Sequence, residues 1–175
     1  MFRNNQELRE LYLGFNKIAT IQQGIFQDLP ALYRLYINNN QLTSVQQRTF
    51  ENLPALYELQ LRVNSISVIE DNTFMNLTGL VGLLLDYNRI TAIQRGMFRG
   101  LPALRTIWLN SNQITTIKPG TFADLPALSN LYVKSFTILY SQAKKTSKHF
   151  INGMSPKRFS GITFIRNEYL LLQVS

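Results

Sequence analysis

Residues that could perform acid–base or nucleophilic chemistry are few and scattered in this chain. It contains no cysteine and one histidine, His149, so disulfides, zinc–thiolate sites and a cysteine nucleophile are excluded. No catalytic triad, glycine-rich phosphate loop or His/Asp cluster with metal-ligand spacing can be read. We interpret Glu58 and Asp86 as solvated charges on a strand face. The sequence therefore predicts neither an enzyme nor a metal or cofactor site.

Side chains suited to molecular recognition recur instead at a fixed spacing. Tyrosine, tryptophan and arginine dominate the binding energy of many protein interfaces, and here they recur with a 24-residue period or at neighbouring offsets. The alternative is that aromatic residues only reflect strand propensity, because they pack well on a pleated surface. The predicted ligand-binding residues are Tyr12, Tyr33, Arg34, Tyr36, Tyr57, Gln60, Arg62, Leu84, Asp86, Arg105, Trp108 and Tyr132.

A 24-residue repeat must position these side chains. Each repeat opens with leucines two or three residues apart, carries an asparagine eight residues after the first leucine, and has a phenylalanine later. The period is too short for a helix pair, and an asparagine column has no role in an α-solenoid. The first leucines are Leu8, Leu32, Leu56, Leu80, Leu104 and Leu128; the asparagines are Asn16, Asn40, Asn64, Asn88 and Asn112; the phenylalanines are Phe26, Phe50, Phe74, Phe98 and Phe122.

The spacing within one repeat predicts a short strand followed by a turn. Leu11 and Leu13 flank Tyr12, so in a strand the two leucines face inward and the tyrosine faces outward. Asn16 follows at the turn, where its amide can pair with backbone groups that would otherwise be buried without partners. The linker Leu-Pro-Ala-Leu then returns the chain to the next strand, except at 77–80, which read Leu-Thr-Gly-Leu.

On these motifs, residues 8–133 resemble the 24-residue, phenylalanine-containing leucine-rich repeats of extracellular proteins, such as Toll-type receptors, Slit-like guidance proteins and variable lymphocyte receptors. The resemblance implies an α/β-type solenoid with a curved parallel β-sheet on the concave face and short helical turns or irregular backbone on the convex face. It implies an extracellular or cell-surface module that binds a protein or glycan ligand in immune recognition, adhesion or guidance. The alternatives are an intracellular scaffold or adaptor and a structural matrix-type protein.

The pattern ends after Val133, so we expect a repeat domain at 1–133 and a basic, irregular tail at 134–175. Of the net charge of +8, the tail carries +6 (7 Lys/Arg against 1 Glu), so the high pI does not predict nucleic-acid binding by the repeats. The simplest hypothesis is a fragment or imperfect gene model of a larger extracellular protein, with a tail that is disordered or not native. The alternative is that Phe2 and Leu8 cap one edge of the solenoid and the tail folds over the other.

Two further features concern the setting of the chain. Asn76-Leu77-Thr78 is an N-glycosylation sequon, expected near the convex end of its repeat, where a glycan would not obstruct the concave face. No stretch has the length or apolar character of a signal peptide or a membrane-spanning helix, so any membrane anchor would belong to a longer parent protein.

Overall fold

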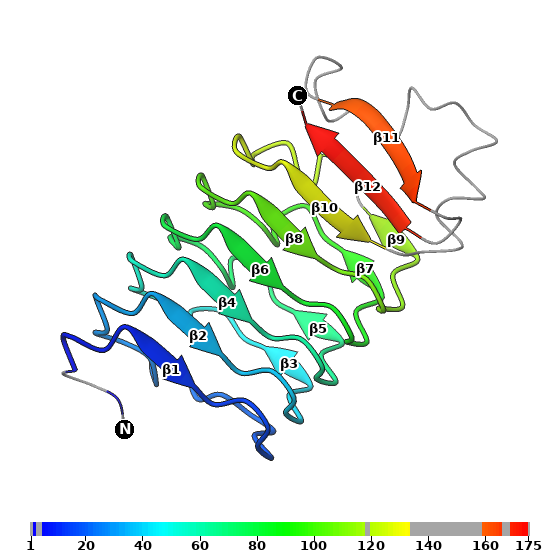
Figure 1. Ribbon diagram of the computed structural model, residues 1–175. Helices are drawn as coiled ribbons and strands as arrows, with labels where there is room; N and C mark the ends of the chain where they lie inside the picture. Colours follow the sequence, from blue (N-terminus) through cyan, green and yellow to red (C-terminus); the bar gives the residue numbers. More distant parts are fainter. Residues whose placement is uncertain (1, 3–4, 118–119, 134–158, 166–168, 175) are drawn as a thin grey trace.

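The computed structural model describes residues 2, 5–117, 120–133, 159–165 and 169–174 and shows a β-solenoid of about five turns (Figure 1). Each turn contributes one short strand to a common sheet, as the repeat pattern predicts. These strands are β1 (Glu10–Tyr12), β2 (Arg34–Tyr36), β4 (Glu58–Gln60), β6 (Gly82–Leu84), β8 (Thr106–Trp108) and β10 (Asn130–Val133).

The register of the sheet equals the sequence period. Neighbouring strands from β1 to β10 are parallel, and each residue pairs with the one 24 positions later, as Leu11 pairs with Leu35. The backbone N–H of the residue after each strand continues the ladder: Leu13 donates to the carbonyl of Tyr36 at 2.7 Å, and Ile37 donates to that of Gln60 at 2.8 Å. Equivalent side chains of all turns therefore form straight rows across the molecule.

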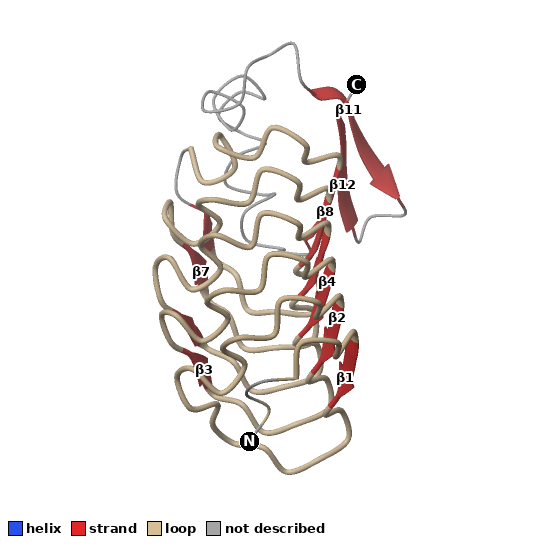
Figure 2. Ribbon diagram, turned by 90° about the vertical axis from the view of Figure 1, so that its left-hand side faces the viewer, coloured by secondary structure: helices blue, strands red, loops and turns tan. Residues whose placement is uncertain are grey.

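The opposite side of each turn consists of turns and very short strands (Figure 2). Two pairs form there, β3 (Ser44–Val45) with β5 (Val68–Ile69) and β7 (Ala92–Ile93) with β9 (Thr116–Ile117). No helix occurs in the part of the chain that the structure describes. Of the two convex-side forms expected from sequence, irregular backbone is therefore the one observed there, and this part is an all-β rather than an α/β-type solenoid.

The core is a set of stacked apolar rows. Phenylalanine rings one repeat apart lie parallel, with centroid distances of 6.1 Å for Phe26 and Phe50, 6.1 Å for Phe50 and Phe74, 6.5 Å for Phe74 and Phe98, and 5.8 Å for Phe98 and Phe122. Leucines of the strands and linkers fill the space between the rings and the sheet; Leu35 and Leu59 are fully buried. Each ring stacks on the equivalent ring of the next turn, so the core depends on stacking of turns.

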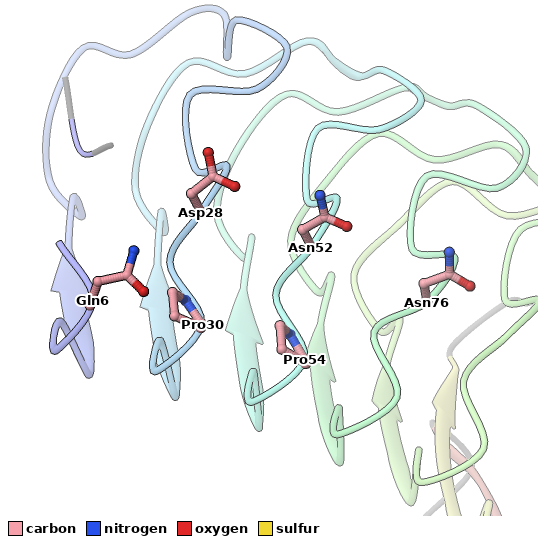
Figure 3. Close-up of a pocket in the computed structure, with 6 residues that line it drawn as sticks. All are labelled: Gln6, Asp28, Pro30, Asn52, Pro54 and Asn76. Atoms are coloured by element: carbon pink, nitrogen blue, oxygen red, sulfur yellow. The ribbon is translucent and has the colours of Figure 1, made fainter. Parts of the chain in front are cut away.

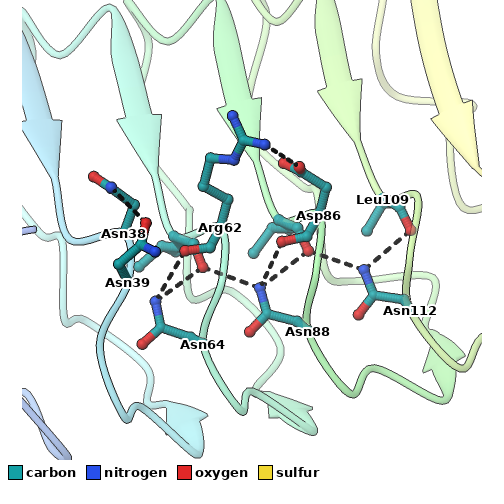
Figure 4. Close-up of polar contacts among 10 residues, drawn as sticks. Asn38, Asn39, Arg62, Asn64, Asp86, Asn88, Leu109 and Asn112 are labelled. Carbon is teal, nitrogen blue, oxygen red and sulfur yellow. Dashed lines mark hydrogen bonds and ion pairs between the residues drawn. The ribbon is translucent and has the colours of Figure 1, made fainter. Parts of the chain in front are cut away.

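Asparagine side chains form the polar row of the interior (Figure 4). The amide nitrogen of Asn88 donates to the carbonyls of Leu61, Leu85 and Asp86 at 3.0, 3.1 and 3.3 Å, and its oxygen accepts the N–H of Ile66 at 3.0 Å. Asn40, Asn64 and Asn112 repeat the bond to the strand-end carbonyl of the preceding turn, at 2.8, 3.0 and 2.9 Å. Each of these amides therefore joins two successive turns.

The turn after each strand requires a left-handed backbone. Phe15, Asn39, Val63, Tyr87 and Ser111 all have φ between 53° and 57°, immediately before the asparagine. Asparagine tolerates this region, whereas for a β-branched residue such as Val63 it is strained. Because the turn aims the asparagine amide inward, the fold requires this conformation whatever residue occupies the position.

The two ends of the solenoid differ. At the N-terminal end, the ring of Phe2 stacks on Phe26 with a centroid distance of 6.1 Å, and Phe2 and Leu8 pack half-buried against the core. At the other end, β12 (Tyr169–Val174) pairs antiparallel with β10 and with β11 (Phe159–Ile165). The tail that was expected to be irregular thus contains two strands. The pairing of β12 with β10 is the arrangement expected if the tail folds over this edge of the solenoid. Residues 134–158, including His149, lie outside the described residues.

Among the residues that the structure places, no helix is long and apolar enough to cross a membrane.

The asparagine row predicts a large position-dependent effect of substitution. Asn88→Ala removes four hydrogen bonds and leaves buried backbone groups unpaired, so we expect it to lower the free energy of unfolding by about 3–5 kcal/mol. Asn16→Ala is the matched control, because Asn16 is exposed and bonds only to carbonyls of its own turn. It should cost under about 1 kcal/mol. If urea denaturation showed equal losses in the free energy of unfolding for the two variants, this would contradict the role of the asparagine row in joining successive turns.

A second stability prediction concerns the linker at 77–80. A Cβ on Gly79 would lie 2.7 Å from the carbonyl oxygen of Pro54, a rigid backbone atom. Gly79→Ala should therefore destabilise the protein by about 1–3 kcal/mol, although alanine stands at the equivalent position of the other linkers. Ala103→Gly is the control and should cost about 1 kcal/mol or less. A thermal melt showing that Gly79→Ala stabilises the chain would exclude this close approach.

Candidate binding surface on the concave face

The concave face is defined here by the outward side chains of the six parallel strands and of the residues that flank them. Strand centres such as Leu35 and Leu59 point into the core with no exposed surface, so their neighbours in the strand point out. The structure brings the predicted row together in register, with Tyr12 beside Tyr36, Gln60 beside Leu84, and Trp108 beside Tyr132. Apart from Tyr12, which is exposed, the members of this row are half-buried.

Aromatic rings on this face contact each other across neighbouring turns. The ring centroids of Tyr12 and Tyr36 are 4.9 Å apart, and Tyr33 stacks on Tyr57 at 4.8 Å. Trp108 stacks on Tyr132 at 5.5 Å near the other end of the sheet. Such pairs contribute about 0.5–1.5 kcal/mol beyond the area they bury, so each ring is held in place by its neighbour. Gln60 and Leu84 separate the two aromatic groups.

An ion pair joins the first two turns beside the tyrosines. Arg34 donates from Nη1 to Oε1 of Glu10 at 2.7 Å, and the hydroxyl of Tyr12 donates to Oε2 of the same carboxylate. These hydrogen bonds, first that from Tyr12 and then that from Arg34, lower the pKa of the Glu10 carboxyl below its ordinary value. The guanidinium carbon of Arg34 also lies 5.4 Å from the centroid of the Tyr33 ring. The charge of Arg34 is therefore neutralised locally.

A second ion pair lies where β4 and β6 end. Nη2 of Arg62 is 3.1 Å from Oδ2 of Asp86, and the guanidinium carbon lies 5.8 Å from the ring centroid of Tyr87, which is exposed (Figure 4). The Asp86 side chain is only 5% exposed, while that of Arg62 is 41% exposed. The interpretation of Asp86 as a solvated charge is therefore wrong: its carboxylate lies buried against Arg62 of the preceding turn. Glu58 is half-buried and accepts a hydrogen bond from Gln60 at 2.6 Å.

The Arg62–Asp86 pair is incompletely satisfied. Among the residues whose side chains the structure describes, Nε of Arg62 and Oδ1 of Asp86 are the buried side-chain atoms without a hydrogen-bond partner. Burial raises the pKa of the Asp86 carboxyl above its ordinary value, and this outweighs the opposite effect of Arg62. The pair is thus a point of this face at which buried polar atoms are left without hydrogen-bond partners.

The remaining predicted residues divide between this face and other surfaces. Arg105 is exposed next to β8, at the margin of the concave face. The asparagine row lies behind the strand ends, and Asn88 in this row is buried. Asn76 lies on a lateral flank of the solenoid, away from the sheet.

Two residues that were not among the predicted ligand-binding residues, Glu10 and Tyr87, complete the contacts of Arg34 and Arg62. The contact of Glu10 could have been predicted from the sequence, because Glu10 lies 24 residues before Arg34 and so at the equivalent position of the preceding turn. No group of three or more His, Cys, Asp or Glu side chains that could hold a metal ion occurs in the described part of the chain.

Asp86 gives the surface a defined pH dependence of stability. The pKa of the Asp86 carboxyl is raised in the folded state. The contribution of this group to the free energy of unfolding is therefore fully present below its ordinary pKa of 3.8, and it is lost as pH rises through the pKa of the folded state. Asp86→Asn removes this titration, and asparagine occupies the equivalent turn position at Asn38 and Asn110. The melting temperature of the wild type relative to Asp86→Asn should therefore fall as pH increases from 3.5 to neutrality. A relative increase over that range would show that the ion pair with Arg62 dominates.

Comparisons with known proteins agree with this architecture. No curated protein sequence matches the chain significantly. Among solved structures, a TLR13–ssRNA13 complex is similar, with 32% identity over 67% of this chain, 16% of that chain and a TM-score of 0.63. The Drosophila Toll–Spatzle complex shares the fold at 22% identity, over 87% of this chain and 21% of that chain, with a TM-score of 0.74.

The chain thus spans at most about a fifth of the length of these two solved chains. The family model for leucine-rich repeats matches residues 1–42, 30–90 and 78–135, and so covers every turn of the solenoid. With its 24-residue register, parallel sheet and asparagine row, the chain belongs to the leucine-rich repeat family.

Proposed function

We propose that residues 1–133 form a recognition domain that binds a protein or glycan ligand through the concave face. The observation that carries this proposal is a set of three aromatic pairs, each partly open to solvent. Two of them, Tyr12–Tyr36 and Trp108–Tyr132, lie on strands of one sheet, and the third, Tyr33–Tyr57, lies at its margin, at the residues that precede β2 and β4. Rings that are already held by their neighbours lose little conformational freedom on binding, and large aromatic side chains are enriched in the energetic centres of interfaces.

A protein or glycan fits the electrostatics of this face better than a nucleic acid does. Binding to nucleic acid depends on basic side chains that are free to meet phosphates. Here Arg34 is paired with Glu10 and Arg62 with Asp86, so both arginines are neutralised across neighbouring turns. Of the similar structures, that of Toll is a complex with Spatzle and that of TLR13 is a complex with single-stranded RNA. We therefore take the protein-type ligand as the proposal and RNA as a competing outcome of the test.

We place this domain outside the cell or at the cell surface, in immune recognition, adhesion or guidance. Similarity to the Toll and TLR13 structures supports that setting. An intracellular scaffold and a matrix-type structural protein are the alternatives. Residues 134–175 stay outside the proposed binding domain, because the leucine and asparagine pattern ends at Val133.

The test uses a double substitution on the concave face. The chain is first screened against arrays of secreted proteins, ectodomains, glycans and single-stranded RNA. For each binder, Tyr36→Ala/Trp108→Ala should lower affinity by at least about 100-fold, because loss of each interfacial aromatic anchor costs about 1.4 kcal/mol or more, which is about tenfold in affinity. Surface plasmon resonance measures the change, and circular dichroism verifies that the solenoid is retained.

Val68→Ala/Met75→Ala is the matched control. Both side chains are exposed and apolar, but they lie outside the concave face, Val68 in β5. This control variant should leave the affinity for each binder unchanged. A binder that is lost with this control and kept with Tyr36→Ala/Trp108→Ala would contradict the proposed face. Binding confined to RNA, with affinity falling steeply as salt is raised, would contradict the proposed ligand class.

A further inference from the structure

A lateral groove of about 420 Å³ runs along one flank of the solenoid, between the sheet and the convex side (Figure 3). It crosses the first turns of the chain and is lined by Gln6, Asp28, Pro30, Asn52, Pro54 and Asn76. Cavities of this size, about 300–1,000 Å³, accommodate small organic groups. None of the concave-face residues contributes to it, so it is a separate surface.

Asn76 is the last member of a row of polar side chains in this groove. Asp28, Asn52 and Asn76 occupy equivalent positions of successive repeats, share a left-handed backbone with φ of 64°, 60° and 68°, and are all exposed. Figure 3 shows their side chains in line along the flank. The next member of the row is Gly100, which carries no side chain. The Asn76 amide is therefore open to solvent and is not covered by the row on its C-terminal side.

The linker after Asn76 has a threonine where the other linkers have a proline, and this threonine completes an acceptor motif for modification. Asn52-Leu53 is followed by Pro54, whereas Asn76-Leu77 is followed by Thr78, which is also exposed. The sequence Asn-x-Thr is the acceptor motif for N-glycosylation, and a surface position is its structural requirement. The close packing of Gly79 on Pro54 shows that this linker still follows the path of the repeat.

We propose that Asn76 carries an N-linked glycan and that the first sugars of this glycan lie in the lateral groove against Asn52 and Pro54. The Asn76 amide nitrogen forms a C–N bond to the anomeric carbon of a lipid-pyrophosphate-linked oligosaccharide. The bond from that carbon to the pyrophosphate oxygen breaks, its electron pair leaves with the pyrophosphate, and the amide proton passes to a base. This inference rests on the secretory setting of the proposed function.

The composition of the groove matches a sugar. Pyranose rings present apolar C–H faces and a rim of hydroxyl groups. The groove combines the apolar rings of Pro30 and Pro54 with the amides of Asn52 and Gln6 and the carboxylate of Asp28. A glycan in this position covers the flank of the first turns and leaves the concave face free, so modification and ligand binding are compatible.

The first experiment measures occupancy of the site. The full chain is directed into the secretory pathway of a eukaryotic cell, and intact-mass spectrometry is compared before and after treatment with a peptide-N-glycosidase. The wild type and Thr78→Ser should carry one glycan, and Thr78→Ala none. Pro54→Thr places a threonine two positions after Asn52, completes the same motif in the preceding turn, and should add a second glycan. An unmodified Asn76 in the secreted wild type would overturn the proposal.

The second experiment tests where the sugars lie. Amide chemical shifts of the glycosylated chain are compared with those of the unglycosylated Thr78→Ala chain. Changes should extend from Asn76 to Asn52, Leu53 and Asp28, one and two turns away. Changes confined to residues 75–79 would overturn groove occupancy.

The outcomes are independent of the proposed function at the concave face. If Tyr36→Ala/Trp108→Ala retains ligand affinity while Asn76 is modified, the concave-face proposal fails and the glycan inference stands. If Asn76 is unmodified while the double variant loses affinity, the reverse holds.

Discussion

The hydrogen bonds of the asparagine side chains are the interaction on which the remaining structure depends. A turn of this solenoid is too small to bury its own polar backbone, because the chain must reverse direction directly after a strand of three or four residues. Asn64 resolves this by bonding to the carbonyl of Ile37 in the preceding turn and to that of Leu61 in its own. The bond reaches its partner only if successive turns stay in a 24-residue register.

The same register arranges the surface of the molecule. Once each turn lies directly above the previous one, residues 24 positions apart become neighbours. Ion pairs and aromatic contacts can then form wherever two such residues have complementary side chains. Arg34 pairs with Glu10, Arg62 pairs with Asp86, and Trp108 stacks on Tyr132, each over one period. The flank follows the same rule, since Asp28, Asn52 and Asn76 form one row. The proposed binding face and the lateral groove therefore both arise from one periodic backbone whose surface residues vary from turn to turn.

The periodic features could be predicted from the sequence, and the local ones could not. Leucine, asparagine and phenylalanine recur without a gap, so the strands, their parallel order and the outward direction of Tyr36 follow from spacing alone. The burial of Asp86 does not follow from spacing. Asparagine stands at the equivalent positions Asn38 and Asn110, and this gives no sign that the Asp86 side chain lies against Arg62. The strands β11 and β12 carry no repeat, and the pairing of β12 with β10 and with β11 comes from contacts that no periodicity encodes.

Native-state amide hydrogen exchange tests the central claim most directly, namely that the asparagine row holds the register of the solenoid. The N–H groups of Leu42, Ile66 and Ile90 lie outside the strands and donate to the side-chain oxygens of Asn64, Asn88 and Asn112 at 3.0, 3.0 and 2.9 Å. The account predicts that these three amides exchange as slowly as the strand amides of Leu59 and Leu83, because all of them open only when neighbouring turns separate. Exchange at the rate of exposed turn amides would contradict it and would show that apolar stacking alone maintains the register.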